Sequence, residues 1–311
     1  MNYFKSTIET DPGNEWSHYS ESSRKRIIAV SSQKGGVGKS TTAINLSAYL
    51  GELGFRTILL DMDPQGNSTC GLGINCGNLD PSVYDMLTSN KNMDKVCRKT
   101  NFKNLSVIPS NWNLVKAEAE LIALNGCEFR LKESIDRIRS DYDFIIIDCS
   151  PSLGTLTTNA LTAANEVLIP VQCEFFAMEG MPKLIETIDN INSRFNSSLE
   201  VSGIVLTMYS KTLFSSRVTD HIKKHFRGHI FDTIIPKNIR LAEASGAGKP
   251  VSVFDSGCRG AHAYKKLAQE IIEYRNNKNS RETFMSPRNL MDFWNTGQSP
   301  RHAISKAGVT H

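Results

Sequence analysis

The sequence predicts an α/β fold, in which a doubly wound, mostly parallel sheet carries helices on both faces. Short runs rich in Ile and Val alternate along the chain with longer helix-like stretches, which is the pattern of parallel strands joined by crossover helices. A glycine-rich loop stands between the first such run and the first helix-like stretch. The chain has 311 residues, 40% of them hydrophobic, which is enough for one large domain with extra segments at its ends.

Strands and helices are expected in regular alternation. The strands are expected at 26–31, 56–62, 104–109, 143–148, 166–172, 201–207 and 230–235. The helices are expected near 39–52, 112–125, 128–140, 155–164, 179–194, 215–227 and 260–275. Beyond Arg275 the sequence is polar and the periodic pattern stops. We therefore expect a polar N-terminal extension over 1–25, the α/β domain over 26–275 and a flexible basic C-terminal tail over 276–311.

The net charge of +4 is unevenly distributed along the chain. Residues 275–311 hold six Lys or Arg and two acids, so the rest of the chain is neutral as a whole. Within that rest, residues 209–240 hold seven Lys or Arg against Asp220 and Asp232. If the protein binds a polyanion, we expect the binding surface in this stretch.

The sequence also bears on the compartment of the protein. It contains no run of 18 or more apolar residues, so we expect no membrane span. The first residues are polar and lack an apolar signal core, which favours a cytoplasmic protein. The seven cysteines include no C-x-x-C pair, and we expect reduced thiols rather than a disulfide framework.

The glycine-rich loop, residues 34–41, reads KGGVGKST and fits a phosphate-binding loop. Its glycines allow successive backbone N–H groups to point into one concavity, and the helix that follows adds its positive N-terminal end. Lys39 can reach the β- and γ-phosphates of a nucleotide, and the Ser40 hydroxyl is placed to ligate Mg²⁺. One lysine is enough for such a loop, so Lys34 requires a separate explanation.

Carboxylates follow two of the expected strands. Asp61 and Asp63 stand at the end of the second strand, and Asp148 ends the fourth. In open α/β sheets, ligands bind at the carboxyl ends of strands, where these acids fall. An acid at this place can hold Mg²⁺ or its water shell, as a Walker-B aspartate does. The pattern leaves open which of Asp61 and Asp63 faces the nucleotide.

With these motifs in place, the chain resembles the ParA/Soj-type chromosome or plasmid partitioning ATPases, which belong to the deviant-Walker-A group (the MinD/ParA superfamily). The resemblance covers residues 26–275 in the order of the family, and both ends lie outside it. The matching stretches are KGGVGKSTTAINL, LLDMDPQGNST, FIIIDCSPSLG, IPVQCEFFAMEGM and TIIPKNIRLAEASGAGKPVSVFDSGCRGAHAYKKLAQE.

The resemblance implies a role for each matching position. Lys34 corresponds to the signature lysine, which reaches the partner's nucleotide in an ATP-bound dimer. Asp63 corresponds to the aspartate that positions the attacking water, and Asp148 to the Walker-B acid, which acts on Mg²⁺ through water. The phosphate loop comprises Gly35, Gly36, Val37, Gly38, Lys39, Ser40 and Thr41, with Ser40 on Mg²⁺, and the residues expected near the adenine are Pro236 and Asn238.

The resemblance also implies a function, that of a Mg²⁺-dependent ATPase of DNA segregation. ATP favours a homodimer, the dimer binds double-stranded DNA without sequence preference, and a ParB-like adaptor stimulates hydrolysis, so we expect a nucleoid-associated protein. The expected DNA contacts fall in the basic stretch 209–240. They are Lys211, Lys237 and Arg240, with Arg217, Lys223 and Lys224 as additions.

Three other functions fit the sequence less well or cannot be separated from this one. A MinD-like membrane-associated cell-division regulator needs a C-terminal amphipathic helix, but Pro287 interrupts the apolar residues of the tail, so we expect no stable membrane association. A reductase like the nitrogenase iron protein needs cysteines in glycine-flanked loops, which Cys97 and Cys127 lack. A ParA-like ATPase that positions another cargo would have the same core, so neither the cargo nor the adaptor can be identified from the sequence.

Overall fold

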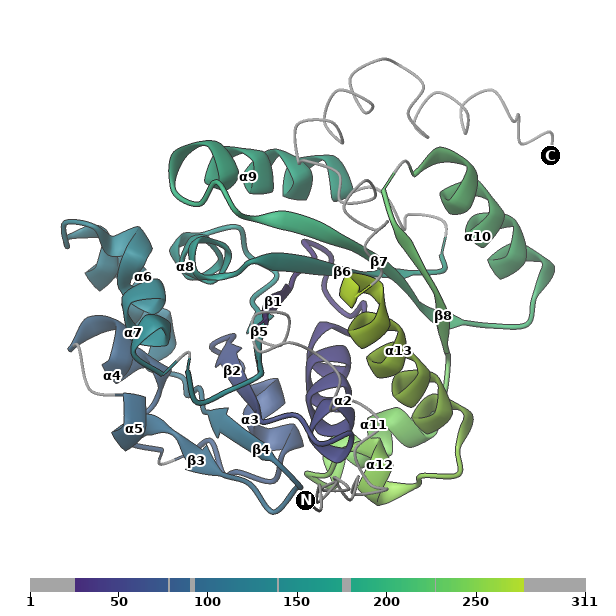
Figure 1. The fold of residues 1–311 in the computed structure, drawn as a ribbon, viewed down its shortest axis with the longest axis horizontal. Helices are drawn as coiled ribbons and strands as arrows, with labels where there is room; N and C mark the ends of the chain where they lie inside the picture. The colour runs from purple at the N-terminus through teal and green to yellow at the C-terminus, as the bar shows by residue number, and fades with distance from the viewer. Residues whose placement is uncertain are drawn as a thin grey trace, which may run out of the picture.

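The computed structural model describes residues 26–77, 79–89, 93–138, 140–174, 180–226 and 228–276. Within these residues, eight strands form one sheet in the order β3-β4-β2-β5-β1-β6-β7-β8, and every neighbouring pair is parallel except β3 and β4 (Figure 1). The predicted α/β fold with a doubly wound sheet is confirmed. The strands are β1 (Arg26–Val30), β2 (Thr57–Met62), β3 (Arg98–Lys99), β4 (Leu105–Ile108), β5 (Phe144–Cys149), β6 (Glu166–Gln172), β7 (Glu200–Tyr209) and β8 (Ile230–Pro236).

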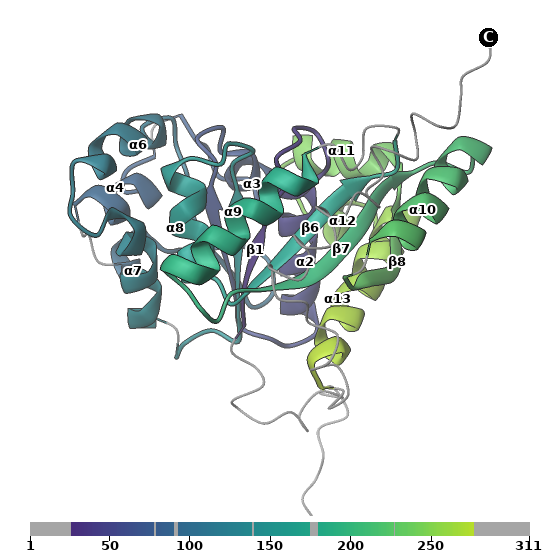
Figure 2. The same ribbon diagram turned by 90° about the horizontal axis from the view of Figure 1, so that it is seen from above.

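Helices cover both faces of the sheet (Figures 1 and 2). One face carries α2 (Lys39–Glu52), α11 (Ile239–Gly246), α12 (Val251–Phe254) and α13 (Arg259–Asn276). The other face carries α4 (Val83–Thr88), α6 (Leu114–Ile122), α7 (Arg130–Ile138), α8 (Thr155–Ala163), α9 (Met181–Arg194) and α10 (Leu213–His225). The short elements α3 (Asn67–Gly71), α5 (Met93–Val96) and η1 (Cys127–Phe129) complete the described fold.

The central strands are buried on both sides because they alternate between two apolar cores. In β1, Ile27 and Ala29 belong to the core beneath α8 and α9, while Ile28 and Val30 belong to the core beneath α2 and α13. This explains why the strands read in the sequence as continuous apolar runs rather than as alternating ones. It also decides which face a polar side chain reaches when it ends such a strand.

The expected elements agree with the structure to within a few residues, and the differences are local. Sequence reasoning missed β3, α3, α4, α5, α11 and α12. These helices have eight residues or fewer, so they are too short to show a repeated apolar stripe. The expected N-terminal extension lies outside the described residues, as does the expected tail beyond Asn276. Across the described part of the chain, no helix combines the length and the apolar character needed to cross a membrane.

A buried ion pair ties three elements together at the amino end of β1. Arg26 donates from Nε to Glu166 Oε1 over 2.8 Å and from its terminal nitrogens to Glu166 Oε2 and to the carbonyl oxygen of Ile271. Both side chains are 2% exposed. The pair therefore links β1 to β6 and to α13, the last helix described.

Removing one charge of this ion pair should lower the free energy of unfolding far more than replacing both residues with apolar ones. We expect Glu166→Gln to lower the free energy of unfolding by about 3 kcal/mol, because it leaves a buried guanidinium without its counter-charge. The double variant Arg26→Met/Glu166→Leu, which removes both charges, should regain most of the loss. Urea unfolding followed by circular dichroism measures both, and a double variant no more stable than Glu166→Gln would contradict this account.

Candidate functional site

The loop between β1 and α2 has the backbone of an anion-binding cradle. Gly36 and Gly38 adopt φ of 74° and 90°, a region that side chains other than glycine rarely adopt. A Cβ placed on Gly35, Gly36 or Gly38 would meet nothing within 4 Å, so all three positions face open space. Gly38 also precedes the first turn of α2 and offers no side-chain cap to its N–H groups. These N–H groups are available to an anion.

The loop lines a cavity of about 560 Å³ at the carboxyl end of the sheet. The predicted residues that line it are Gly35, Gly36, Gly38, Lys39, Ser40, Thr41 and Asp63. The structure adds residues that sequence reasoning missed, namely Ile44, Gln65, Asn67, Cys70, Gly71, Pro151, Met208, Ser245 and Gly246. A cavity of this size, with a cation at one wall and a carboxylate at another, can hold a small phosphorylated ligand.

Lys39 is the cation of this cavity. Its side chain is 7% exposed, and Nζ donates to the carbonyl oxygen of Lys34 over 3.2 Å. Burial lowers the pKa of Lys39, and the nearby carboxylates of Asp148 and Asp63 oppose that shift. An ammonium that is buried in this way gains most from a ligand that brings further negative charge.

Asp61 and Asp148 lie side by side on neighbouring strands. They are register partners in β2 and β5, both are fully buried, and strand alternation directs both toward the core of α2. Burial is the main cause that raises the pKa of each carboxyl above its ordinary value. The charge of Asp148 raises the pKa of Asp61 further. Two like charges placed this close need compensating donors or a cation.

A magnesium ion would fit here through Asp148. Its Oδ2 accepts from Ser68 Oγ over 2.6 Å, whereas Oδ1 is buried and has no hydrogen-bond partner among the described residues. The Ser40 hydroxyl lies near enough to stabilise the charge of this carboxylate. A buried, unpaired carboxylate oxygen beside a hydroxyl that lines the cavity is a suitable donor set for a hard, hydrated cation.

The short helix α3 supplies the donors that hold the acids. The N–H and Oγ1 of Thr69 both donate to Asp61 Oδ2, over 2.8 and 2.7 Å. Ser110 donates from its N–H to Thr69 Oγ1 over 2.9 Å and from its Oγ to the Asp63 carbonyl oxygen over 2.7 Å. The signal for α3 in the sequence was the hydroxyl pair Ser68-Thr69, which follows the acids.

Asp63 and Asp61 differ in burial and in their contact with the cavity. Asp63 lines the cavity and is 7% exposed, while its Oδ1 accepts from the N–H of Gln65 over 3.0 Å. Asp61 is fully buried and does not line the cavity. Of the two acids, Asp63 is the one placed to touch a ligand.

Lys34 does not line this cavity. It lines an adjacent one of about 430 Å³, together with Lys237, Glu174 and Met208. The structure thus brings the predicted signature lysine close to one of the predicted DNA-contact lysines. Val37 is buried, and its carbonyl oxygen accepts from Thr207 Oγ1 over 2.8 Å, so it anchors the loop to β7 rather than facing the ligand.

The residues predicted near the adenine lie at the junction of β8 and α11. Pro236 ends β8, and Asn238 caps α11 by accepting from the N–H of Arg240 over 3.0 Å. Neither is among the residues that line the cavity of about 560 Å³. Their role at the adenine stays a prediction.

The predicted DNA-contact residues are all exposed and form two groups. Lys211, Lys237 and Arg240 follow β7 and β8 at the carboxyl end of the sheet, where the N–H of Lys237 donates to the Tyr209 carbonyl oxygen. The second group lies on α10 and comprises Arg217, Lys223 and Lys224. Arg240 is paired with Glu243 over 2.9 Å and with Asp255 over 3.1 Å.

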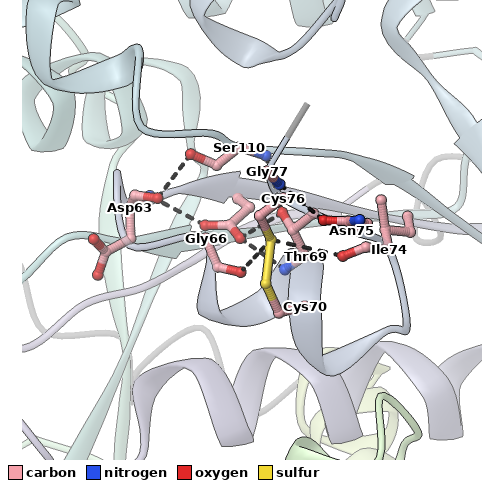
Figure 3. Close-up of a disulfide and its surroundings, with 10 residues drawn as sticks. Asp63, Gly66, Thr69, Cys70, Ile74, Asn75, Cys76, Gly77 and Ser110 are labelled. Carbon is pink, nitrogen blue, oxygen red and sulfur yellow. Dashed lines mark hydrogen bonds between the residues drawn. A yellow bond between two sulfur atoms is a disulfide. The ribbon is translucent and has the colours of Figure 1, made fainter. Parts of the chain in front are cut away.

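The expectation that all cysteines are reduced is wrong for one pair. Cys70, in α3, and Cys76, in the loop that follows, form a disulfide (Figure 3). The chain turns back after α3, so residues six apart approach each other without any C-x-x-C spacing. The free cysteines among the described residues are Cys97, Cys127, Cys149, Cys173 and Cys258.

Comparison with known proteins identifies relatives of this chain. The AAA domain family matches residues 25–201. The chain is 44% identical over 247 residues to the sporulation initiation inhibitor protein Soj of Bacillus subtilis strain 168, covering 79% of this chain and 98% of that protein. It is 42% identical over 264 residues to the chromosome partitioning protein ParA of Myxococcus xanthus strain DK1622, covering 85% and 91%.

A solved structure with a ligand shares the fold. Cobyrinic acid a,c-diamide synthase of Mycobacterium smegmatis, with a bound ATP analogue and magnesium, superposes with a TM-score of 0.72 and 33% sequence identity. The match covers 81% of this chain and 96% of that chain.

The hydroxyl of Thr69 should contribute measurably to the free energy of unfolding through its hydrogen bond to Asp61. We expect Thr69→Val to lower the free energy of unfolding by about 2 kcal/mol, because it removes a donor to Asp61 and leaves the N–H of Ser110 without an acceptor. Thr69→Ser keeps the hydroxyl and should lose much less. Urea unfolding without nucleotide compares the two, and equal stability of both variants would contradict the assignment.

Proposed function

The chain belongs to the ParA/Soj family of chromosome-partitioning ATPases, and from that premise we propose that it uses Mg²⁺-bound ATP to form a DNA-binding homodimer. One observation carries the proposal. Lys39 and Asp63 line one cavity with the glycine cradle, while Lys34 lies outside that cavity. The cavity therefore combines the groups that nucleotide binding requires, and Lys34 is not among them.

Nucleotide binding follows from the residues around the cavity. The N–H groups of the loop and Lys39 bind the β- and γ-phosphates, and Asp63 orients the attacking water. Ser40 directly and Asp148 through water would hold Mg²⁺, which supplies positive charge against the phosphates when bound. Asp61 keeps the neighbouring segment in place through Thr69.

Lys34 acts on the nucleotide of the partner subunit in this proposal. Its side chain is half-exposed and lines a separate cavity, so it makes no contribution to the phosphates of its own subunit's nucleotide in the monomer. A cation that arrives only on dimerisation couples the nucleotide state to the oligomeric state, as an arginine finger does when it is supplied in trans.

Substitution of Lys39 and substitution of Lys34 should have different effects on ATP binding. We expect Lys39→Ala to abolish ATP binding, because the phosphates lose their buried ammonium, whereas Lys34→Ala still binds ATP as a monomer but neither dimerises nor hydrolyses it. Calorimetry measures binding, and light scattering after size exclusion measures mass. A Lys34→Ala protein that dimerises and turns over at the wild-type rate would refute action in trans.

DNA binding rests on the exposed basic residues after β7 and β8 and on α10. A dimer doubles this surface, and neutralising phosphates releases counterions, so binding is not specific for sequence and depends on salt. The same dimer would present a composite surface to a ParB-like adaptor, which we propose as the partner that stimulates hydrolysis. Release of DNA after hydrolysis would then follow from loss of the dimer.

The ion pairs of Arg240 give a two-sided test of this surface. We expect Arg240→Ala to weaken binding to non-specific duplex DNA and to reduce the salt slope by about 0.9. Glu243→Gln should strengthen binding, because it frees Arg240 from a competing carboxylate. Interferometry with ATP over a salt series measures both. Lys132→Ala, on α7, is the matched control, and an unchanged slope in Arg240→Ala would remove Arg240 from the interface.

A further inference from the structure

We propose that Cys70 and Cys76 form a reversible thiol–disulfide pair whose redox state sets the affinity of the adjacent cavity for nucleotide. The proposal rests on the proposed nucleotide binding by residues 34–41, but that binding requires neither cysteine. The pair is therefore a modification site next to the nucleotide site. Redox control can be refuted without refuting nucleotide binding.

The backbone places the two cysteines for this bond. Their Cα atoms are 6.2 Å apart, within the range that a disulfide spans. Cys70 lies near the end of α3 and Cys76 in the loop that follows (Figure 3). Cys70 is exposed and Cys76 is half-buried. Solvent exposure makes Cys70 the sulfur that an oxidant or a reductant in solution reaches first.

The reduced state is also accommodated. Cys76 Sγ lies 3.5 Å from the carbonyl oxygen of Gly66 and 3.6 Å from that of Ile74. Once the bond is broken, the Cys76 S–H can donate to either oxygen, so reduction leaves no buried polar group without a partner. Both redox states therefore fit the same local fold.

The bond is connected directly to the ligand site. Cys70 itself lines the cavity, and the two residues before it, Ser68 and Thr69, donate to Asp148 and Asp61. A Cβ on Gly66 would lie 3.2 Å from Cys76 Sγ, so the cross-linked loop packs against the residue that precedes α3. The disulfide thus closes a ring over residues 70–76, which begins directly after the two residues that donate to the buried acids.

The same loop also contacts the chain just after α11, which contributes to the lining of the cavity. A Cβ on Gly73 would lie 2.9 Å from the carbonyl oxygen of Gly248, which means that the two backbones are in close contact. Gly248 follows the end of α11, where Ser245 and Gly246 line the cavity. A tether at Cys76 therefore restrains the loop after α3, which packs directly against the residue that follows α11.

This tether should favour binding. Ordering a mobile segment on binding costs conformational entropy, and a cross-link made beforehand removes part of that cost. The oxidised protein already holds α3 where its donors reach Asp61 and Asp148. We therefore expect the oxidised protein to bind nucleotide more tightly than the reduced one.

The chemistry balances with a low-molecular-weight disulfide as the oxidant. The Cys70 thiolate attacks one sulfur of the oxidant, forms a mixed disulfide and releases one thiolate. The Cys76 thiolate then attacks Cys70 Sγ, forms the intramolecular bond and releases the second thiolate. Two protein thiols are oxidised and one external disulfide is reduced, and the two protons that the cysteines lose are taken up by the two released thiolates, which become thiols.

The experiment compares one purified protein in two redox states. The full chain is equilibrated with glutathione disulfide or with dithiothreitol, its free thiols are counted by alkylation and mass spectrometry, and ADP binding is measured by calorimetry. We expect the oxidised form to carry two fewer free thiols and to bind ADP several-fold more tightly. Equal affinity of the two forms, or failure of the bond to form, overturns the proposal and leaves nucleotide binding intact.

Variants assign the effect to this pair. Cys70→Ser and Cys76→Ser should each bind ADP with an affinity that no longer responds to redox state. Cys258→Ser is the matched control and should keep the response, because Cys258 does not line the cavity and its sulfur accepts from the N–H of Ala261. A response that persists in Cys70→Ser overturns the proposal. Failure of the wild-type protein to bind ADP in either state overturns the proposed function as well.

Discussion

The repulsion between two buried carboxylates is the constraint on which the site depends. Asp61 and Asp148 are register partners in β2 and β5, fully buried and directed toward the same helix. Both carboxylates need compensating charge or donors to remain ionised there, and the structure supplies them from two directions. Lys39 comes from α2, and hydroxyl and N–H donors come from α3. Among the described residues, Oδ1 of Asp148 has no hydrogen-bond partner and could contact a cation.

This arrangement makes the charge of a bound ligand part of the electrostatic balance of the site. A ligand that brings Mg²⁺ adds positive charge where the carboxylates need it, and its phosphates add negative charge where Lys39 needs it. Binding would then compensate the charges of the carboxylates and of Lys39 at the same time. The segment 63–76 is close to both, so anything that restrains it, whether a hydrogen bond from Ser110 or the bond between Cys70 and Cys76, acts on the ligand site without touching the phosphates.

Much of this could be predicted from the sequence, because the parts in question depend on local pattern. The strands are recognisable in the sequence as apolar runs. The ends of these runs are followed by the loop from Lys34 to Thr41 and marked by the acids Asp63 and Asp148. What could not be predicted depends on register and on chain reversal. The pairing of Asp61 with Asp148 requires β2 to lie next to β5, the role of Thr69 requires a helix of five residues, and the disulfide requires the turn after that helix. The separation of Lys34 from the cavity of Lys39, five residues away, is likewise set by the curvature of the loop.

The ion pair at the start of β1 has a consequence for how the chain is completed during synthesis. Arg26 is among the first described residues, yet its partners Glu166 and Ile271 lie 140 and 245 residues further along. Contacts this distant in sequence form late and slow folding. Until α13 has left the ribosome, the strand that leads into the phosphate loop carries a guanidinium with no complete set of acceptors. The first strand therefore completes the hydrogen bonds of its Arg26 side chain only when almost the whole domain has been made.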